Sequence, residues 1–476
     1  MEQLSGLDYS FLAMEDAAAH GHIGGLGILD SDTPDGPITF DVVRAMLESR
    51  LHLVAPYRRR LVSVPLGVDR PHWIEDEDFD LDFHMRHNAV PPPGDNRQLA
   101  ELVARIHSRP LDRGRPLWEF YYIDGLADGG VAIYTKTHHS TIDGASGASL
   151  LEATMDLGPE GREVEPPTEE WRPEREPPPW QMLGRSLGAL ALSPARLARF
   201  QVQAVRNGIQ AVRGRTPSAR RETQMLSQPG GLAPRTFFNR RITTHRSLAF
   251  GSVSLDDVKA VKNAFGTTVN DVIMAACAGA LRRWLLDHDE LPEKPLRAMV
   301  PISVRDESDT EVGNRVSAMV AVLPTTEPDA VERLQLAHQA MSVAKTQHAA
   351  LPADLLQEFA EAAPPAVANL AFRLVSSTPV ADVVNPPFNV VISNVPGPPF
   401  PLYTAGARMR HSFPVSAITH GVGLNITVFS YDGLIDFGLV GCSDLTGDLW
   451  PLMGHLIDET EELVTRARSQ ESGTTP

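Results

Sequence analysis

The residues best suited to chemistry stand together at the end of one apolar segment. Two adjacent histidines, His138 and His139, are followed after three residues by Asp143 and Gly144. A neutral imidazole can take a proton from an alcohol or a thiol, because its ordinary pKa is about 6.5. Asp143 could hold the loop in shape, and Gly144 permits backbone conformations that a β-carbon would forbid. Since side chains alternate along a strand, we expect one histidine to be buried support and the other to project into a cleft.

Other chemistry fits these residues less well. Histidines are also found as ordinary core or surface residues, and that interpretation remains open for the pair. A zinc site would need three or four convergent ligands, and the chain lacks the helical two-histidine pattern of metalloproteases. A serine hydrolase would need a Gly-x-Ser-x-Gly elbow, whereas Gly144-Ala145-Ser146-Gly147 has the wrong spacing. We therefore expect no metal.

The elements around the histidines predict a mixed α/β unit over residues 1–154. Apolar residues recur at helical spacing over 38–54 and 97–108, so both segments are predicted to be helices. The segments 118–123 and 131–137 are predicted to be two strands joined by a glycine turn. The second strand leads directly into the histidine pair.

A different composition marks residues 155–234, which we interpret as a proline-rich linker followed by a basic amphipathic helical connection. Between Pro177 and Arg221 there are eight arginines and no acidic residue. One interpretation is a helix that packs on the body with solvated arginines. The other is contact with an anionic membrane or lipid-droplet surface through 182–221.

Residues 235–476 predict a second α/β unit of similar kind. Its clearest helix is 269–286, where Thr268 and Asp271 form a capping-box pattern, and a final helix is expected over 448–468. Strands are predicted at 296–304, 316–323, 388–393, 423–430 and 434–441. Two such units suggest a pseudo-twofold pair with a substrate site between them.

Composition limits the classes of function. The 476 residues include 43 basic and 60 acidic side chains, a net charge of −17, which argues against nucleic-acid binding. The two cysteines, Cys277 and Cys442, fit a reducing compartment. We see no secretory signal and no apolar run long enough to span a membrane. We therefore expect a cytoplasmic protein, with the inner membrane or a lipid droplet as a candidate peripheral location.

The motif His138-His139-x-x-x-Asp143-Gly144 resembles the active-site motif of the CoA-dependent acyltransferase superfamily, which includes chloramphenicol acetyltransferase and condensation domains. Further segments narrow the resemblance to the bacterial wax ester synthase/acyl-CoA:diacylglycerol acyltransferase family, over residues 4–465. These segments are Leu7-Asp8-Tyr9-Ser10-Phe11-Leu12-Ala13-Met14-Glu15, His22-Ile23-Gly24-Gly25-Leu26, Pro116-Leu117-Trp118, Asn270-Asp271-Val272 and Ile392-Ser393-Asn394-Val395-Pro396-Gly397-Pro398.

This resemblance implies an α/β fold of layered α+β type. It would have two chloramphenicol-acetyltransferase-like halves, each a mixed sheet flanked by helices, with the active-site tunnel at their interface. It implies that His139 is the general base and that Asp143 is structural. Acyl-CoA would be a co-substrate with no bound cofactor, and the acceptor would be diacylglycerol or a long-chain fatty alcohol. Two alternatives stay open: another alcohol acceptor, or a non-catalytic protein that binds lipid droplets or membranes.

Other candidate site residues each have two interpretations. Asn270, in the first turn of the 269–286 helix, could donate to the oxyanion or cap the helix. Ser393 and Asn394 end an apolar strand and could form a loop at the tunnel mouth or an ordinary exit from the strand. Glu15 could orient the acceptor or only a loop. Met274 and the stretch 351–375 could line an acyl slot or belong to the core.

Overall fold

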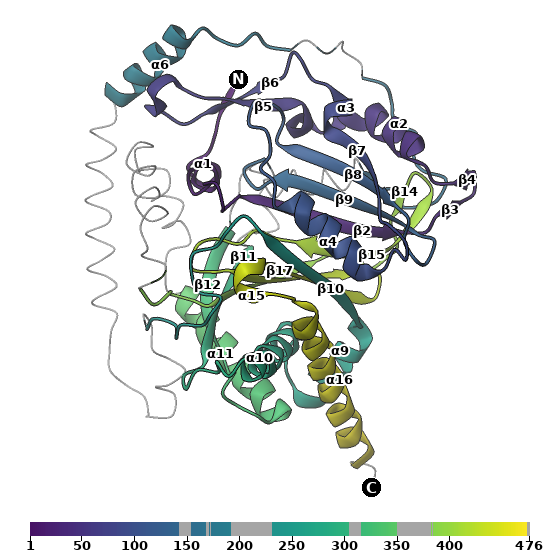
Figure 1. Ribbon diagram of the computed structural model, residues 1–476, viewed down its shortest axis with the longest axis vertical. Coiled ribbons are helices and arrows are strands. Elements are labelled where there is room, and N and C mark those ends of the chain that lie inside the picture. The colour runs from purple at the N-terminus through teal and green to yellow at the C-terminus, as the bar shows by residue number, and fades with distance from the viewer. Residues whose placement is uncertain are drawn as a thin grey trace.

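Two six-stranded mixed sheets, one in each lobe, organise the chain (Figure 1). The computed structural model describes residues 1–141, 154–167, 171, 173–191, 231–303, 316–349, 382 and 384–473. The strand order is β14-β15-β2-β9-β8-β7 in the first sheet and β10-β17-β16-β13-β11-β12 in the second. The strands of the first sheet are β2 (His22–Leu29), β7 (Met85–Ala89), β8 (Trp118–Asp124), β9 (Val131–His138), β14 (Tyr403–Thr404) and β15 (Ala407–Val415). Those of the second are β10 (Arg246–Ser254), β11 (Leu296–Ser303), β12 (Val316–Leu323), β13 (Val390–Pro396), β16 (Leu424–Tyr431) and β17 (Leu434–Cys442).

Helices cover both faces of the first sheet. On one face, α4 (Asn96–His107) buries Leu99 and Val103 in a cluster with residues of β2 and β9. On the other face, α2 (Phe40–Arg50) buries its apolar stripe against β9 and β8. Because neither face meets water, β8 and β9 are apolar on both sides rather than alternating. The structure thus confirms both predicted helices and both predicted strands, although α2 ends at Arg50 and a 3₁₀ turn follows it.

Small elements surround this first lobe. Helix α1 (Gly6–Ala13) begins at the cap residue Ser5, whose hydroxyl accepts the Asp8 N–H. The others are β1 (Glu2–Gln3), β3 (Asp32–Thr33), β4 (Gly36–Pro37), η1 (Leu51–Leu53), η2 (Ala55–Arg58), β5 (Arg59–Val62), η3 (Pro65–Gly67), β6 (His72–Glu75), α3 (Leu81–His84) and α6 (Pro179–Ala191). Strands β1, β6 and β5 form a separate three-stranded sheet, and α6 lies next to it at the outer end of the lobe (Figure 1).

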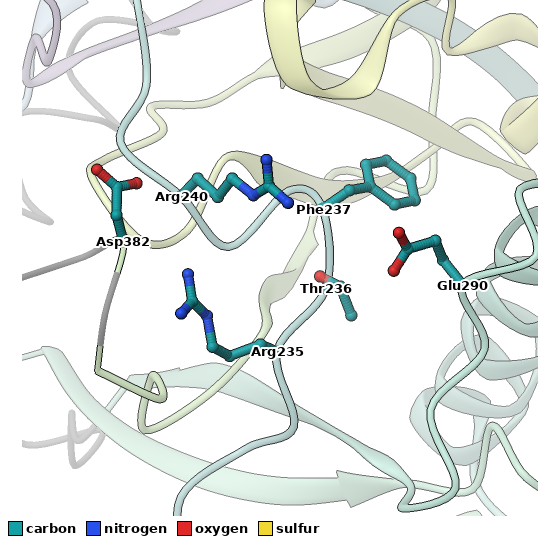
Figure 2. A pocket seen from close by; sticks show the side chains of 6 residues that line it. All are labelled: Arg235, Thr236, Phe237, Arg240, Glu290 and Asp382. Carbon is teal, nitrogen blue, oxygen red and sulfur yellow. The ribbon is translucent and has the colours of Figure 1, made fainter.

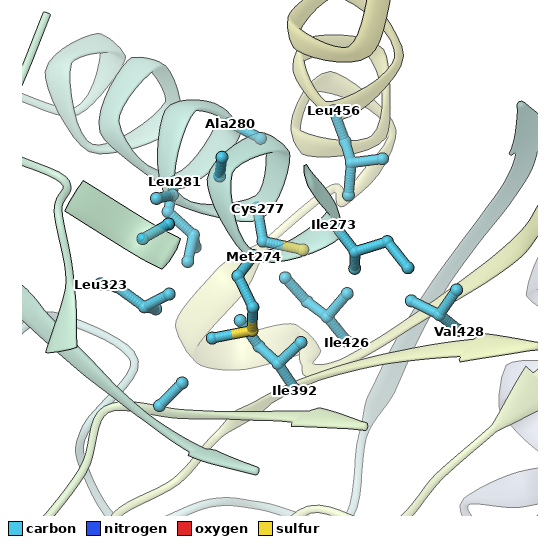
Figure 3. Packing of buried hydrophobic residues seen from close by; sticks show 14 of the residues in the cluster. Ile273, Met274, Cys277, Ala280, Leu281, Leu323, Ile392, Ile426, Val428 and Leu456 are labelled. Carbon is cyan, nitrogen blue, oxygen red and sulfur yellow. The ribbon is translucent and has the colours of Figure 1, made fainter. Parts of the chain in front are cut away.

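The helices of the second lobe gather on the face of its sheet that lies away from the first lobe (Figure 1). They are α9 (Leu255–Phe265), α10 (Val269–Asp287), α11 (Ala330–Ala349) and α16 (Trp450–Gly473), and a short helix, α15 (Ser443–Thr446), precedes α16. As predicted, α10 begins with a capping box between Thr268 and Asp271. Met274 and Cys277 of α10 point onto the sheet toward Ile392 and Ile426 (Figure 3). Met274 is therefore a core residue rather than part of an acyl slot.

The second part of the chain completes the sheet of the first. Strand β15, which we did not predict, pairs antiparallel with β2 and brings β14 to the edge of the first sheet. The lobes approach so closely here that a β-carbon on Gly438 would lie 1.7 Å from the carbonyl oxygen of Pro414. Phe250 and Phe413 pack across the same interface with their ring centroids 4.6 Å apart. The division at residues 154 and 235 remains a prediction, but the two sheets do not divide the chain at a single point.

The predicted class, a layered fold of mixed sheets and helices, is confirmed. Within the described ranges, no single helix is both long and apolar enough to cross a membrane. The helices α9 and α10 pass that test only as a pair bent by 99°, and α10 is mostly buried in the core.

Candidate active site

The histidine pair lies where the central strand β9 ends. His138 is the last residue of the strand and pairs with His22 of β2, while His139 begins the following turn. The His138 side chain is buried and that of His139 is half-buried. The exit from the strand therefore lets the two neighbouring imidazoles occupy different environments, as the alternation of side chains predicts.

Both ring nitrogens of His138 are occupied. Its Nδ1 accepts the N–H of Ser140 at 3.1 Å and the Ser140 hydroxyl at 2.6 Å. A nitrogen that accepts a backbone N–H carries no proton, so the ring proton is on Nε2. Nε2 then donates to Oε1 of Glu15 at 3.0 Å. His138 has no free nitrogen for a substrate, so its geometry is that of a supporting residue.

Glu15 holds His138 from the segment between α1 and β2. Its Oε1 also accepts the Gly21 N–H at 2.7 Å, and its Oε2 accepts Arg113 at 2.6 Å. Burial would raise the pKa of Glu15, but the hydrogen bonds from His138, Arg113 and Gly21 outweigh it and lower the pKa to about 2. Glu15 is therefore ionised at neutral pH. Its contacts are with the protein itself, which favours the loop-orienting interpretation of this residue.

Gly21 has to be a glycine at this position. A β-carbon here would lie 2.9 Å from Nε2 of His138, which is closer than real contacts allow. The Gly21 carbonyl accepts the His139 N–H at 2.8 Å. Gly21 thus binds His139 through its carbonyl and leaves room for the His138 ring.

The His139 ring is held in place by stacking. Phe11 of α1 lies parallel to it, with ring centroids 4.1 Å apart and an interplanar angle of 12°. Its Nδ1 is buried and makes no hydrogen bond to another described residue. Burial lowers the pKa of His139 below its ordinary value and outweighs a hydrogen bond to the backbone of His139 itself, which raises the pKa, so the ring is neutral at neutral pH. A neutral, oriented imidazole can act as a general base through a ring nitrogen that the acceptor hydroxyl reaches.

Part of the predicted site lies outside the described residues. Asp143 and Gly144 belong to this part, as does the stretch 351–375 that was considered for the acyl slot. Their roles remain predictions.

The remaining candidates meet in the second lobe. Asn270, in the first turn of α10, accepts a hydrogen bond on Oδ1 from Nδ2 of Asn394, at 3.4 Å. Thr268 caps α10, so the capping interpretation of Asn270 is wrong. Ser393 and Asn394 lie inside β13, where they pair with Thr427 and Val428 of β16, so the prediction that the strand ends at these residues is wrong. The structure therefore brings Asn270 and Asn394 together, and no hydrogen bond between described residues joins them to the histidines.

A surface pocket lies on the second lobe, away from these residues. Its volume is about 460 Å³, and its lining includes two arginines, Arg235 and Arg240, and two carboxylates, Glu290 and Asp382 (Figure 2). None of its lining residues belongs to the predicted site. In the ranges that the structure describes, no three His, Cys, Asp or Glu side chains are grouped so as to hold a metal ion.

Three residues of the site were missed by the sequence analysis. Phe11 and Gly21 lie in or beside the N-terminal segments that carry the resemblance, but nothing in the spacing shows that they contact His139. Arg113, which forms an ion pair with Glu15, lies three residues after Pro110, and no sequence pattern identifies it as part of the site.

A two-lobed α/β fold with a histidine pair at the end of a central strand is the arrangement of a CoA-dependent acyltransferase. Residues 4–273 match the wax ester synthase/diacylglycerol acyltransferase catalytic domain, and residues 312–464 match the C-terminal domain of that family. The chain belongs to this family, as its motifs predicted, and it is an acyltransferase.

Relatives and a solved structure agree over the whole length. A putative diacylglycerol O-acyltransferase of Mycobacterium tuberculosis (strain ATCC 25618 / H37Rv) is 36% identical over 474 residues, which cover 99% of this chain and 92% of the relative. The O-acyltransferase WSD of Acinetobacter baylyi is 32% identical, with 97% and 96% covered. The wax ester synthase/diacylglycerol acyltransferase structure from Marinobacter aquaeolei VT8 superimposes with a TM-score of 0.69 at 32% identity, over 98% of this chain and 99% of that one.

Proposed function

We propose that this chain transfers a long-chain acyl group from acyl-CoA to the hydroxyl of diacylglycerol, of a long-chain fatty alcohol, or of both. The products would be triacylglycerol and wax ester. The family membership and the names of the relatives support this class of acceptor. Acyl-CoA is the co-substrate, and the reaction needs no bound cofactor.

His139 acts as the general base in a complex that holds both substrates. It takes the proton of the acceptor hydroxyl as that oxygen attacks the thioester carbonyl carbon. The C–S bond then breaks, and the imidazolium returns the proton to the departing CoA sulfur. The proton ends on the thiol and the acyl group on the acceptor oxygen, so no covalent acyl-enzyme is needed.

The observation that carries this proposal is the state of the His139 ring. It is neutral, it is stacked on Phe11, and it directly follows the strand that ends in His138. His138 is held by Glu15, and structural roles are proposed for Asp143 and Gly144. The place of His139 in the motif distinguishes it from the core histidines, because His22 and His84 also have buried nitrogens without a partner among the described residues.

Asn270 is the proposed donor to the tetrahedral oxyanion. The bond from Asn394 engages its Oδ1 and leaves its NH₂ group without a partner among the described residues. The first turn of α10 also presents backbone N–H groups and the positive end of the helix dipole. Ser393 and Asn394 are proposed to line the substrate passage near it.

The experiment measures release of CoA thiol from palmitoyl-CoA with and without an acceptor. Hexadecanol and dioleoylglycerol are offered together with one labelled acyl-CoA, and the lipid products are separated. We expect release only with an acceptor and its loss in His139→Ala, with folding retained by circular dichroism. Acceptor-dependent turnover that survives in His139→Ala would refute the assignment of the base. Vesicle binding without any thiol release would favour the non-catalytic alternative.

The helical connection is the proposed contact with an anionic membrane or lipid-droplet surface. The start of α6 packs on the first lobe through Met182, whereas the neighbouring Trp180 is 74% exposed. An exposed tryptophan beside a run of arginines is typical of interfacial helices. Flotation with phosphatidylglycerol vesicles should fall when the arginines of 185–221 are neutralised, and unchanged flotation would contradict the proposal.

A further inference from the structure

The 14–21 loop, which joins α1 to β2, contacts both histidines of the motif. Glu15 at its start accepts a hydrogen bond from Nε2 of His138, and the carbonyl of Gly21 at its end accepts the His139 N–H. A shift of this loop would therefore move both imidazoles together. The contacts that hold the loop in place therefore also determine the positions of the two imidazoles.

Two side chains of the second lobe hold this loop. Nε2 of His420 lies 2.8 Å from Oδ2 of Asp16, across 404 positions of sequence. The guanidinium of Arg246, at the start of β10, donates to the carbonyl of Ala18. The His420 side chain is only 7% exposed, so its bond to Asp16 is largely shielded from water.

The protonation of His420 follows from its other ring nitrogen. Nδ1 accepts the backbone N–H of Ile242 at 3.2 Å, so it carries no proton. The ring proton must then be on Nε2, which donates to Asp16. The second lobe thus fixes both the orientation of the ring and the direction of its hydrogen bond.

Asp16 joins this contact to the shape of the loop. Its Oδ1 accepts the N–H groups of Ala18 at 2.8 Å and Ala19 at 2.9 Å, which closes a tight turn. Its Oδ2 receives His420. One carboxylate therefore folds the loop with one oxygen and binds it to the other lobe with the second.

We propose that His420 is a positioning residue for acyl transfer: through Asp16 it holds, from the second lobe, the loop that places His138 and His139. The inference rests on the proposed role of His139 as the base. The base lies in the first lobe and its support reaches into the second, so efficient turnover requires the two lobes to be docked.

The test compares three substitutions of His420 in the full-length enzyme. His420→Gln can place an amide N–H near the Nε2 position, whereas His420→Asn reaches only the Nδ1 position and His420→Ala reaches neither. We expect kcat to fall roughly 10- to 100-fold in the Asn and Ala variants, with KM for palmitoyl-CoA and for the acceptor within about threefold. The Gln variant should retain most of the wild-type kcat. A role in packing alone would not give this order.

Asp16→Asn keeps an oxygen that can accept the Ala18 and Ala19 N–H groups, but it replaces the oxygen that accepts the hydrogen bond from His420. The double variant Asp16→Asn/His420→Asn should be no slower than the slower single variant, because both remove the same bond. Arg97→Ala is the matched control, since it breaks another inter-lobe ion pair, to Asp448 at 2.9 Å, without contacting the loop. Its kcat should be unchanged.

Three results would overturn the inference: wild-type kcat in His420→Asn, equal losses in the Asn and Gln variants, or additive effects in the double variant. His139→Ala is measured in parallel to separate the two proposals. If that variant is inactive while His420→Asn is normal, only the positioning role fails. If it remains active, the proposed base fails.

Discussion

Replacing Glu15 by glutamine should destabilise the first lobe in a pH-dependent way. The ordinary pKa of this carboxyl is 4.5, and its contacts lower it to about 2. One pKa unit corresponds to about 1.4 kcal/mol, so the ionised carboxylate stabilises the folded state by roughly 3 kcal/mol at neutral pH. Because the pKa is lowered on folding, this contribution is complete above pH 4.5 and is lost as the pH falls toward 2. Glutamine does not titrate, and its oxygen can still accept the Gly21 N–H.

The measurement is urea unfolding of the wild type and Glu15→Gln at pH 7 and pH 4. Near-ultraviolet circular dichroism reports on the ordered aromatic residues of both lobes, which include the Tyr57 and Trp118 stack of the first lobe, with centroids 4.1 Å apart. We expect the variant to lose roughly 1–3 kcal/mol at pH 7, and the difference from wild type to shrink by roughly 1 kcal/mol at pH 4. Glu48→Gln is the control, because Glu48 is 58% exposed and pairs only with Arg44 along the same helix. A Glu15→Gln penalty that is absent at pH 7, or equal at both pH values, would refute the reasoning.

Three further outcomes follow from the site. The kcat/KM for acyl transfer should fall as the pH decreases, with an apparent pKa below the ordinary 6.5, because the base must be neutral and burial lowers the pKa of His139. A midpoint above 6.5 in the pH–rate profile would contradict this prediction. Gly21→Ala should lower the free energy of unfolding by about 1–3 kcal/mol, because the new methyl group would contact His138. Gly25→Ala is the control and should be nearly neutral, because its β-carbon would lie 3.4 Å from the Thr135 hydroxyl. Equal melting temperatures of the two variants would show that the site accommodates the methyl group. Phe11→Ala removes the ring stacked on His139 and should lower kcat roughly tenfold in the thiol-release assay, an expectation that fails if kcat is unchanged in the folded variant.

The local chemistry of the site was accessible from the sequence. The His138-His139 pair follows an apolar strand, and the alternation of side chains already separates a buried histidine from a projecting one. The helix at Val269 carries its start signal in its own residues, Thr268 and Asp271, so its beginning was predicted to the residue. These features depend on neighbours in the chain, which is why periodicity and capping patterns identify them.

Only the tertiary structure decided what surrounds the base. Strand β15 leaves the second lobe to pair with β2, and a register shift between Met409 and His411 interrupts the alternation of its side chains. The bond between His420 and Asp16 joins residues 404 positions apart. No local pattern encodes such partners, because they are selected by the packing of two sheets against each other rather than by neighbours in the chain. The sequence by itself thus determined the position of the histidine pair and the elements on either side of it, and the docking of the two lobes determined what holds the pair in place.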